Sequence, residues 1–261
     1  MLVQALNSHP RIVCFRELFN GRHDFVDFSV EGYDNFSARD RARREEDPIA
    51  FLEERIFRVW PPDVSAVGFK FLYGQIWDYP GLVDHLRGDT DLYVLHLQRR
   101  NVLRTLTSLK LAKQTDIWFE DRQAPPKLTR TNLMRALRYP PAVVRAARRW
   151  VQRRNLPMQS PARVAISVEE LFESLVAMQM SIENYDAAFA KHAKLSIFYE
   201  DLVERREETL AAAQEFLGVE PRELTTTLQR QNPEPLRDLI ENYDELRAAF
   251  SNTPEAALFD D

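Results

Sequence analysis

The chain has 261 residues, 44% of them hydrophobic, which is enough to bury a substantial core in one domain or in one domain with a lid. Its single cysteine, Cys14, excludes an internal disulfide framework and fits a reducing compartment, so we expect a cytoplasmic protein. No run approaches the roughly 18 apolar residues that a membrane-spanning helix needs, so no transmembrane segment is expected.

The net charge of −5 conceals an uneven distribution along the chain. Residues 99–154 contain 15 lysines and arginines against three acidic residues, which gives this part a charge of +12 and the remainder about −17. Such a basic segment suits a small anionic ligand or a nucleic acid. Aromatic residues that could stack on bases are sparse there, and the overall pI is acidic. We therefore expect a small polyanion as the ligand, and no nucleic acid.

The first predicted elements are short. Apolar residues at positions 2, 3 and 6 predict a helix over residues 1–8, and a strand is expected over residues 12–15. Glu17 follows this strand directly. The next charged stretch, residues 37–48, is typical of a solvated helix or loop, and residues 49–60 have the apolar spacing of an amphipathic helix.

A central strand is predicted over residues 64–71, with Lys70 near its carboxyl end, and a crossover helix over residues 75–87. These elements lead into the stretch around which we expect the chain to be organised. A buried strand at residues 92–97 is followed by two arginines, and Asn101 is a good N-cap for the helix after them.

The start of that helix is a predicted anion site, because the first N–H groups of a helix have no partner within the helix. Arg100 lies at the corner, and Ser108 lies two turns into the helix. A guanidinium and a hydroxyl at this spacing can converge on one phosphate group. The alternative is a solvated arginine at a strand end and a serine on the helix surface.

Residues 116–161 are the least regular part, since prolines separate two short basic amphipathic pieces. We expect an insertion or lid here, or else a basic pair of surface helices. A long helix is predicted over residues 168–192, with Ser167 and Glu170 at the spacing of a capping box.

The last predicted strand covers residues 195–199 and ends at Tyr199. An aromatic ring at a strand end is suited to stacking on a base, although such a tyrosine is more often ordinary core. A helix over residues 207–217 is closed by Gly218 at the C′ position. The five histidines show no close pairing with one another or with Cys14, so no metal site is expected.

Five segments, taken in order, resemble sulfotransferases that use 3′-phosphoadenosine 5′-phosphosulfate (PAPS), in particular the bacterial carbohydrate-type enzymes. The segments are LNSHPRIVCFRELFN, the Gly-x-Lys at Lys70, the Arg-Asn of Arg100 with Ser108 after it, YEDL from Tyr199, and ExFLGVEP around Gly218. Five matches in the same order are hard to produce by chance. The resemblance implies a single α/β domain over residues 1–261, three-layered with a central parallel sheet and related to P-loop nucleoside triphosphate hydrolases.

The resemblance also implies a function: transfer of a sulfonate group from PAPS to a hydroxyl of a carbohydrate or another small polar acceptor, with no metal. In that reading Glu17 is the general base, and Lys70 stabilises charge on the sulfonate or orients the acceptor. The residues implied to bind the nucleotide are Arg100 and Ser108 at the 3′-phosphate, Tyr199 at the adenine, and Arg230 as a further phosphate contact. A surface glutamate, a lysine at a strand edge and a solvated Arg230 are the corresponding alternatives.

The N-terminus departs from the family pattern. No glycine precedes Gly21, and no glycine-rich loop for the 5′-phosphosulfate is present. We expect one of three causes: a start codon assigned downstream of the true one, a truncated chain, or a protein that has lost half of its contacts with PAPS. The last case leads to an alternative function, a catalytically inactive nucleotide-binding or interaction protein that retains the fold.

Overall fold

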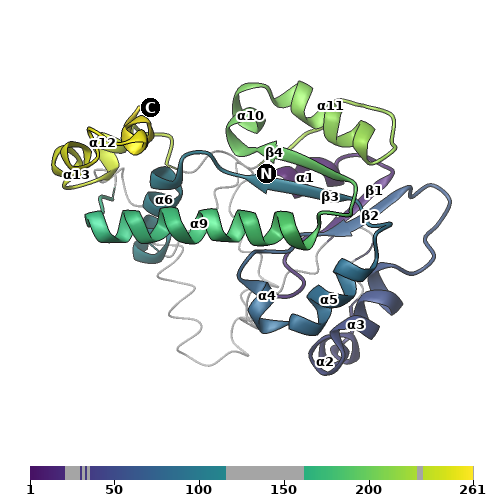
Figure 1. The fold of residues 1–261 in the computed structure, drawn as a ribbon. Helices are drawn as coiled ribbons and strands as arrows, with labels where there is room; N and C mark the ends of the chain where they lie inside the picture. The colour runs from purple at the N-terminus through teal and green to yellow at the C-terminus, as the bar shows by residue number, and fades with distance from the viewer. Residues whose placement is uncertain (21–29, 31–32, 34–35, 116–161, 228–231, 261) are drawn as a thin grey trace, which may run out of the picture. The chain divides into compact units, whose positions relative to one another are not determined.

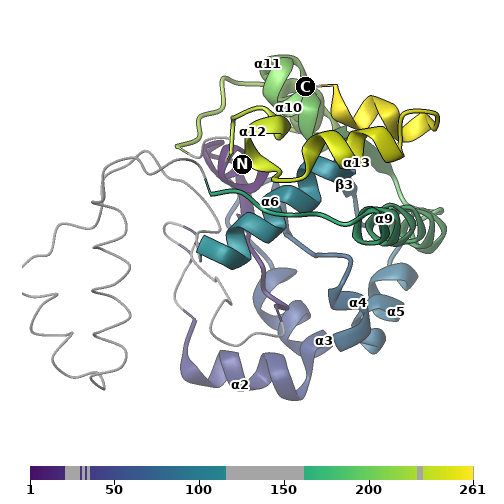
Figure 2. The ribbon, with the colours of Figure 1, turned by 90° about the vertical axis from the view of Figure 1, so that its left-hand side faces the viewer.

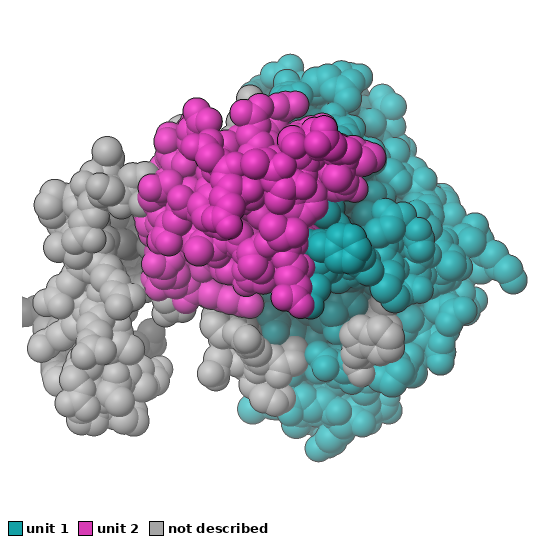
Figure 3. Space-filling model, turned by 60° about the vertical axis from the view of Figure 1, so that its left-hand side comes forward, with its two compact units in different colours: residues 1–102, 172–226 teal, residues 103–171, 227–261 magenta. Residues whose placement is uncertain are grey.

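A computed structural model of the chain describes residues 1–20, 30, 33, 36–115, 162–227 and 232–260. These residues belong to two compact units, one formed by residues 1–102 and 172–226 and the other by residues 103–171 and 227–261 (Figure 3). The predicted insertion at residues 116–161 lies outside the described residues. None of the helices in the described parts has the length and apolar character that crossing a bilayer requires.

The described residues of the first unit include four parallel strands in two pairs. β1 (Ile12–Phe15) pairs with β2 (Ala66–Phe69), and β3 (Val94–Gln98) pairs with β4 (Lys194–Phe198). Parallel strands separated by helices confirm the α/β class that the sequence predicts. The expected central sheet takes the form of two two-stranded sheets in the described residues.

Helices cover both faces of these strands. Val13 and Phe15 of β1 belong to one buried cluster, whereas Ile12 belongs to another. Because successive strand residues point to opposite faces, the two clusters lie on opposite sides of β1. The first cluster includes Leu82 of α5 (Pro80–Gly88), and the second includes Leu210 of α11 (Arg206–Phe216) (Figure 1). Helices of the first unit therefore pack on both faces of β1.

The remaining helices of the first unit are mostly short. They are α1 (Leu2–Asn7), α2 (Ala38–Glu46), α3 (Pro48–Phe51) with a π-helical turn at Leu52–Ile56, α4 (Gln75–Asp78), α10 (Tyr199–Glu204), and most of α9 (Val168–Ala188). The predicted crossover helix is split into α4 and α5 because Pro80 disfavours the helical conformation at Tyr79, whose φ is −134°.

The second unit contains α6 (Val102–Thr115) from its second residue onward, α12 (Leu236–Leu239), α13 (Tyr243–Ala249) and a 3₁₀ helix at Pro254–Phe259. α12 and α13 follow one another along the chain (Figure 2). A parallel bridge between Val164 and Ile240 joins the segment before α9 to the segment after α12.

Two predicted helix ends are confirmed. Ser167 and Glu170 form the capping box of α9, with the Ser167 amide donating to the Glu170 carboxylate at 2.8 Å and the Glu170 amide donating to the Ser167 hydroxyl at 3.0 Å. Gly218 follows α11 with a φ of +70°, the left-handed conformation in which glycine avoids the strain of a Cβ atom.

Candidate active site

The carboxyl ends of both strand pairs bring predicted site residues together. Phe15 lies opposite Phe69 in register, so the residues that follow β1 and β2 leave the same edge. Gln98 lies opposite Phe198 in the same way, so the residues that follow β3 and β4 also share an edge. In parallel α/β proteins, ligands bind at this end of the strands.

Glu17 and Lys70 meet at the first of these edges. The Lys70 Nζ lies 2.5 Å from the Glu17 Oε1, and Asn20 Nδ2 donates to the other carboxylate oxygen at 2.8 Å. The Lys70 amide donates to the Phe15 carbonyl at 2.9 Å. This bond fixes the backbone of Lys70 to the end of β1, the strand that precedes Glu17. Their side chains are 26% and 41% exposed, so both are within reach of a ligand in solution.

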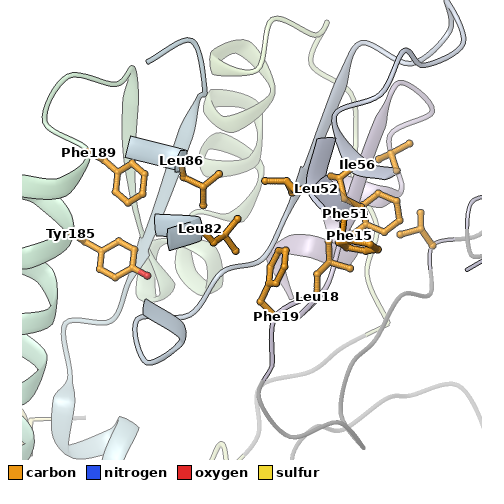
Figure 4. Close-up of a cluster of buried hydrophobic side chains, with 12 residues drawn as sticks. Phe15, Leu18, Phe19, Phe51, Leu52, Ile56, Leu82, Leu86, Tyr185 and Phe189 are labelled. Atoms are coloured by element: carbon orange, nitrogen blue, oxygen red, sulfur yellow. The ribbon is translucent and has the colours of Figure 1, made fainter. Parts of the chain in front are cut away.

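The backbone beside Glu17 is anchored by the core. Leu18 and Phe19 are fully buried, and the ring of Phe19 packs at 5.4–6.2 Å, edge to face, against the rings of Phe51, Phe69, Phe71 and Tyr79. Figure 4 shows Leu18 and Phe19 close to Phe15 and Phe51 in a cluster of buried side chains. Aromatic pairs in this geometry stabilise a fold beyond the area they bury. The packing of Leu18 and Phe19, the two residues that follow Glu17, thus fixes the position of its backbone.

A buried arginine completes this anchor. Arg44 of α2 is 2% exposed, donates to the Leu18 carbonyl at 2.8 Å, and pairs with the Glu45 carboxylate at 2.8 Å. The sequence analysis missed Arg44 because the stretch at residues 37–48 is so strongly charged that it indicates a solvated helix. Nothing in the sequence indicates this role, because the need of the buried Leu18 carbonyl for a donor becomes visible only in the fold.

Arg100 is held by residues that follow β4. Its guanidinium forms a two-bond contact with the Asp201 carboxylate, at 3.0 and 2.9 Å, and lies 3.9 Å from the ring of Phe198. Hydrogen bonds from Arg100 and then from Arg205 lower the pKa of Asp201 to about 2. These contacts fix the plane of the guanidinium and use two of its five N–H donors.

The predicted anion site before α6 binds a carboxylate of the protein itself. Both Glu200 oxygens accept from the Arg100 amide, at 3.1 and 3.2 Å, and one accepts from the Asn101 amide at 3.3 Å. The corner therefore has the donors that an anionic oxygen needs, and the Glu200 carboxylate accepts from them.

Tyr199 starts α10 and does not end the preceding strand as predicted. Its ring carries the guanidinium of Arg99 at 4.0 Å from the ring centroid, a cation–π contact. The tyrosine is half-buried at the edge shared by β3 and β4, and it is not part of either buried cluster.

Ser108 belongs to the second unit and is described within it. Its hydroxyl accepts from Asn232 Nδ2 at 3.5 Å, and Arg104, one helical turn earlier, donates to the Asn232 and Glu234 carbonyls at 3.0–3.2 Å. This side of α6 therefore faces the chain after residue 231. Arg230 itself lies outside the described residues.

No cluster of three or more histidine, cysteine, aspartate or glutamate residues is placed to hold a metal ion within the described ranges. The fold and the strand ends thus define an α/β protein whose parallel strands end in charged side chains with anion-binding donors.

Comparison with known proteins identifies distant relatives that align with almost the whole chain. The chain is 28% identical over 267 aligned positions to nodulation protein H of Rhizobium tropici, an alignment that covers 99% of this chain and 87% of that protein. It is 26% identical over 268 positions to nodulation protein H of Rhizobium meliloti strain 1021, covering 99% of the chain and 89% of the relative. The chain is therefore a distant homologue of nodulation protein H along its whole length. No protein-family model and no solved structure matches it.

Proposed function

We propose that the protein is a PAPS-dependent sulfotransferase with a P-loop-type fold, which moves a sulfonate group to a hydroxyl of a carbohydrate or another small polar acceptor. The contact between Glu17 and Lys70 at adjacent strand ends carries this proposal, because both residues stand in segments that resemble the sulfotransferase pattern. The full-length homology to nodulation protein H supports it, since the alignments cover 99% of the chain and so include the positions of all five segments.

Sulfonate transfer resembles phosphoryl transfer, with a loose, in-line transition state in which positioning and charge stabilisation dominate. PAPS would supply the sulfonate, which is bonded to its 5′-phosphate, and 3′,5′-bisphosphoadenosine would be the leaving group. Glu17 accepts the proton of the acceptor hydroxyl at its carboxylate, which is already oriented by Asn20 and Lys70. Once Glu17 is neutral, the ammonium group of Lys70 loses its counter-charge and can face the negative charge of the transferring group.

We assign the nucleotide to Arg100, Ser108, Tyr199 and Arg230. The support for Arg100 is its fixed guanidinium beside two amides that bind an anionic oxygen. The support for Tyr199 is its ring at the same strand edge. The assignment of Ser108 and Arg230 rests on the resemblance of their segments.

The test combines binding and transfer. Calorimetric titration with 3′,5′-bisphosphoadenosine measures nucleotide binding, and labelled PAPS with a panel of glycans measures transfer. Arg100→Ala should weaken nucleotide binding about 10- to 150-fold, since hydrogen bonds to charged groups contribute about 1.5–3 kcal/mol. Arg87→Ala is the matched control, because Arg87 is also a half-exposed arginine paired with an aspartate, at 51% exposure against 49% for Arg100.

The outcomes separate the two functions considered. Transfer to any hydroxyl acceptor, lost in the Arg100 variant and kept in the Arg87 variant, supports the sulfotransferase. Nucleotide binding without transfer to any acceptor would indicate instead a nucleotide-binding protein that retains the fold. An unmodified chain that neither binds bisphosphoadenosine nor transfers sulfonate removes the proposal.

A further inference from the structure

A buried polar network lies next to the segment that follows Lys70. At its centre is His96 of β3, which is 5% exposed. The His96 Nε2 lies 2.5 Å from the Tyr73 hydroxyl, its Nδ1 lies 3.3 Å from the Asp186 carboxylate, and Gln98 Nε2 lies 3.1 Å from the same Nδ1. A buried imidazole with polar partners at both nitrogens is held in one orientation.

The groups around His96 determine its charge. Burial lowers the pKa of His96, against the opposite pull of Asp186, so the imidazole is neutral at neutral pH. Lys194 Nζ contacts Asp186 at 2.5 Å and lowers the pKa of that carboxyl, which therefore stays ionised. A neutral imidazole carries one ring proton: on Nδ1 it is donated to Asp186 and Nε2 accepts from the Tyr73 hydroxyl, whereas on Nε2 it is donated to the Tyr73 oxygen and Nδ1 accepts from Gln98; Tyr73 is bonded to the ring in both cases.

The same segment is fastened at two further points. Tyr185 of α9 donates its hydroxyl to the Leu72 carbonyl at 3.2 Å, and its ring lies 4.5 Å from the ring of Tyr73. The Leu72 amide donates to Gln75 Oε1 at 2.9 Å. Residues 72–75 are thus tied to β3 and α9, while the Lys70 amide is tied to the end of β1. The backbone of Lys70 is held on both sides.

From this geometry we infer that Tyr73, His96 and Asp186 are positioning residues for Lys70, an inference that rests on the proposed sulfotransferase function. A lysine side chain has four flexible carbons, so its 2.5 Å contact with Glu17 depends on a fixed backbone. The network supplies this constraint from parts of the chain that touch neither Glu17 nor Lys70. It extends the site by residues that act through Lys70 and not on the substrate.

Tyr73→Phe tests the inference, because it removes one hydroxyl and keeps the ring. We expect kcat of sulfonate transfer to fall about 10- to 100-fold, as for a displacement of about 1 Å at a reacting group, with KM for PAPS within about twofold. A second measurement needs no turnover: the rate at which acetic anhydride acetylates Lys70 at pH 8, followed by mass spectrometry. Lys70 should react several-fold faster in the variant, because its ammonium is no longer held on Glu17.

Tyr243→Phe is the control, since it removes another tyrosine hydroxyl that forms a hydrogen bond, to the Phe259 carbonyl at 2.9 Å, but in the second unit. It should leave the reactivity of Lys70 unchanged. Should Tyr73→Phe fail to fold, Asp186→Asn serves instead, because that side chain is 44% exposed and substitutions at exposed positions disturb folding less than those in the core. The same changes are expected for it, in the same direction and smaller.

The results distinguish this inference from the proposed function. Unchanged Lys70 acetylation in Tyr73→Phe, or in Asp186→Asn where the first variant does not fold, overturns the positioning role whether or not the protein transfers sulfonate. Faster acetylation in a protein that shows no transfer supports the positioning of Lys70 and rejects the sulfotransferase. Equal acceleration in the Tyr243 control would show that a general loss of stability causes the effect, which also overturns the inference.

Discussion

Glu17→Gln is the sharpest test of the proposed base, because it removes the charge of the side chain and keeps its shape. The carboxylate contacts Lys70 at 2.5 Å and Asn20 at 2.8 Å, and a glutamine keeps one oxygen to accept one of these bonds. Both members of the ion pair are partly exposed, so its loss should lower the free energy of unfolding by at most about 1 kcal/mol. Loss of a general base, in contrast, lowers kcat about 10²- to 10⁴-fold, or about 3–5 kcal/mol in activation free energy.

The assay compares three quantities for the variant and the unmodified chain: kcat for sulfonate transfer at saturating PAPS, the dissociation constant of bisphosphoadenosine, and the free energy of unfolding in urea. We expect a large fall in kcat with nearly unchanged binding and stability. Glu53→Gln is the control, since Glu53 also pairs with a basic side chain, His85 at 2.9 Å, on the surface. A kcat for Glu17→Gln within about threefold of the unmodified chain would refute the reasoning, as would parallel losses of binding and stability.

Three further predictions concern the fold that supports the site. Phe19→Ala should lower the free energy of unfolding by about 3–5 kcal/mol, because the ring is fully buried among four others; a shift of the urea midpoint equivalent to less than about 1 kcal/mol would contradict this packing. Gly218→Ala should cost about 1 kcal/mol through its φ of +70° alone, since nothing lies within 4 Å of an added Cβ; an unchanged melting temperature would reject this. His96 has a folded pKa below its ordinary value of 6.5, so the unfolded chain binds its proton first. The contribution of neutral His96 to the free energy of unfolding is complete above pH 6.5 and is lost as the pH falls through the folded pKa. Urea unfolding from pH 7.5 to 5 should show this loss of stability, and the loss should be smaller in His96→Gln.

The local elements could be predicted because their causes lie a few residues apart. The capping box of Ser167 and Glu170 requires only a spacing of three, and the left-handed turn at Gly218 requires only a glycine after a helix. The same holds for the strands before Glu17, Lys70 and Arg100. Their pairing in register then brings Glu17 and Lys70 together, as expected for the ends of parallel strands.

The contacts that complete the site depend on residues far apart in the chain. Asp201 lies 101 positions after Arg100, and no local pattern indicates that its carboxylate binds the guanidinium. The sequence suggests for His96 only the question of a metal ligand, whereas its partners Tyr73 and Asp186 come from positions 23 residues before it and 90 residues after it. Arg44 could not be identified either, because a charge in a charged stretch is usually solvated, and only the packed loop at Leu18 makes it buried.

The carboxylate of Glu200 affects which anions can bind at the corner before α6. A ligand that binds the Arg100 and Asn101 amides has to displace a negative group that already neutralises them, so entry is a swap of one anion for another. A singly charged newcomer then gains little over the glutamate it replaces, whereas a doubly charged one gains a full extra charge beside the guanidinium. We therefore expect this corner to bind doubly charged anions in preference to singly charged ones. Chloride or acetate should compete poorly with a phosphate group there.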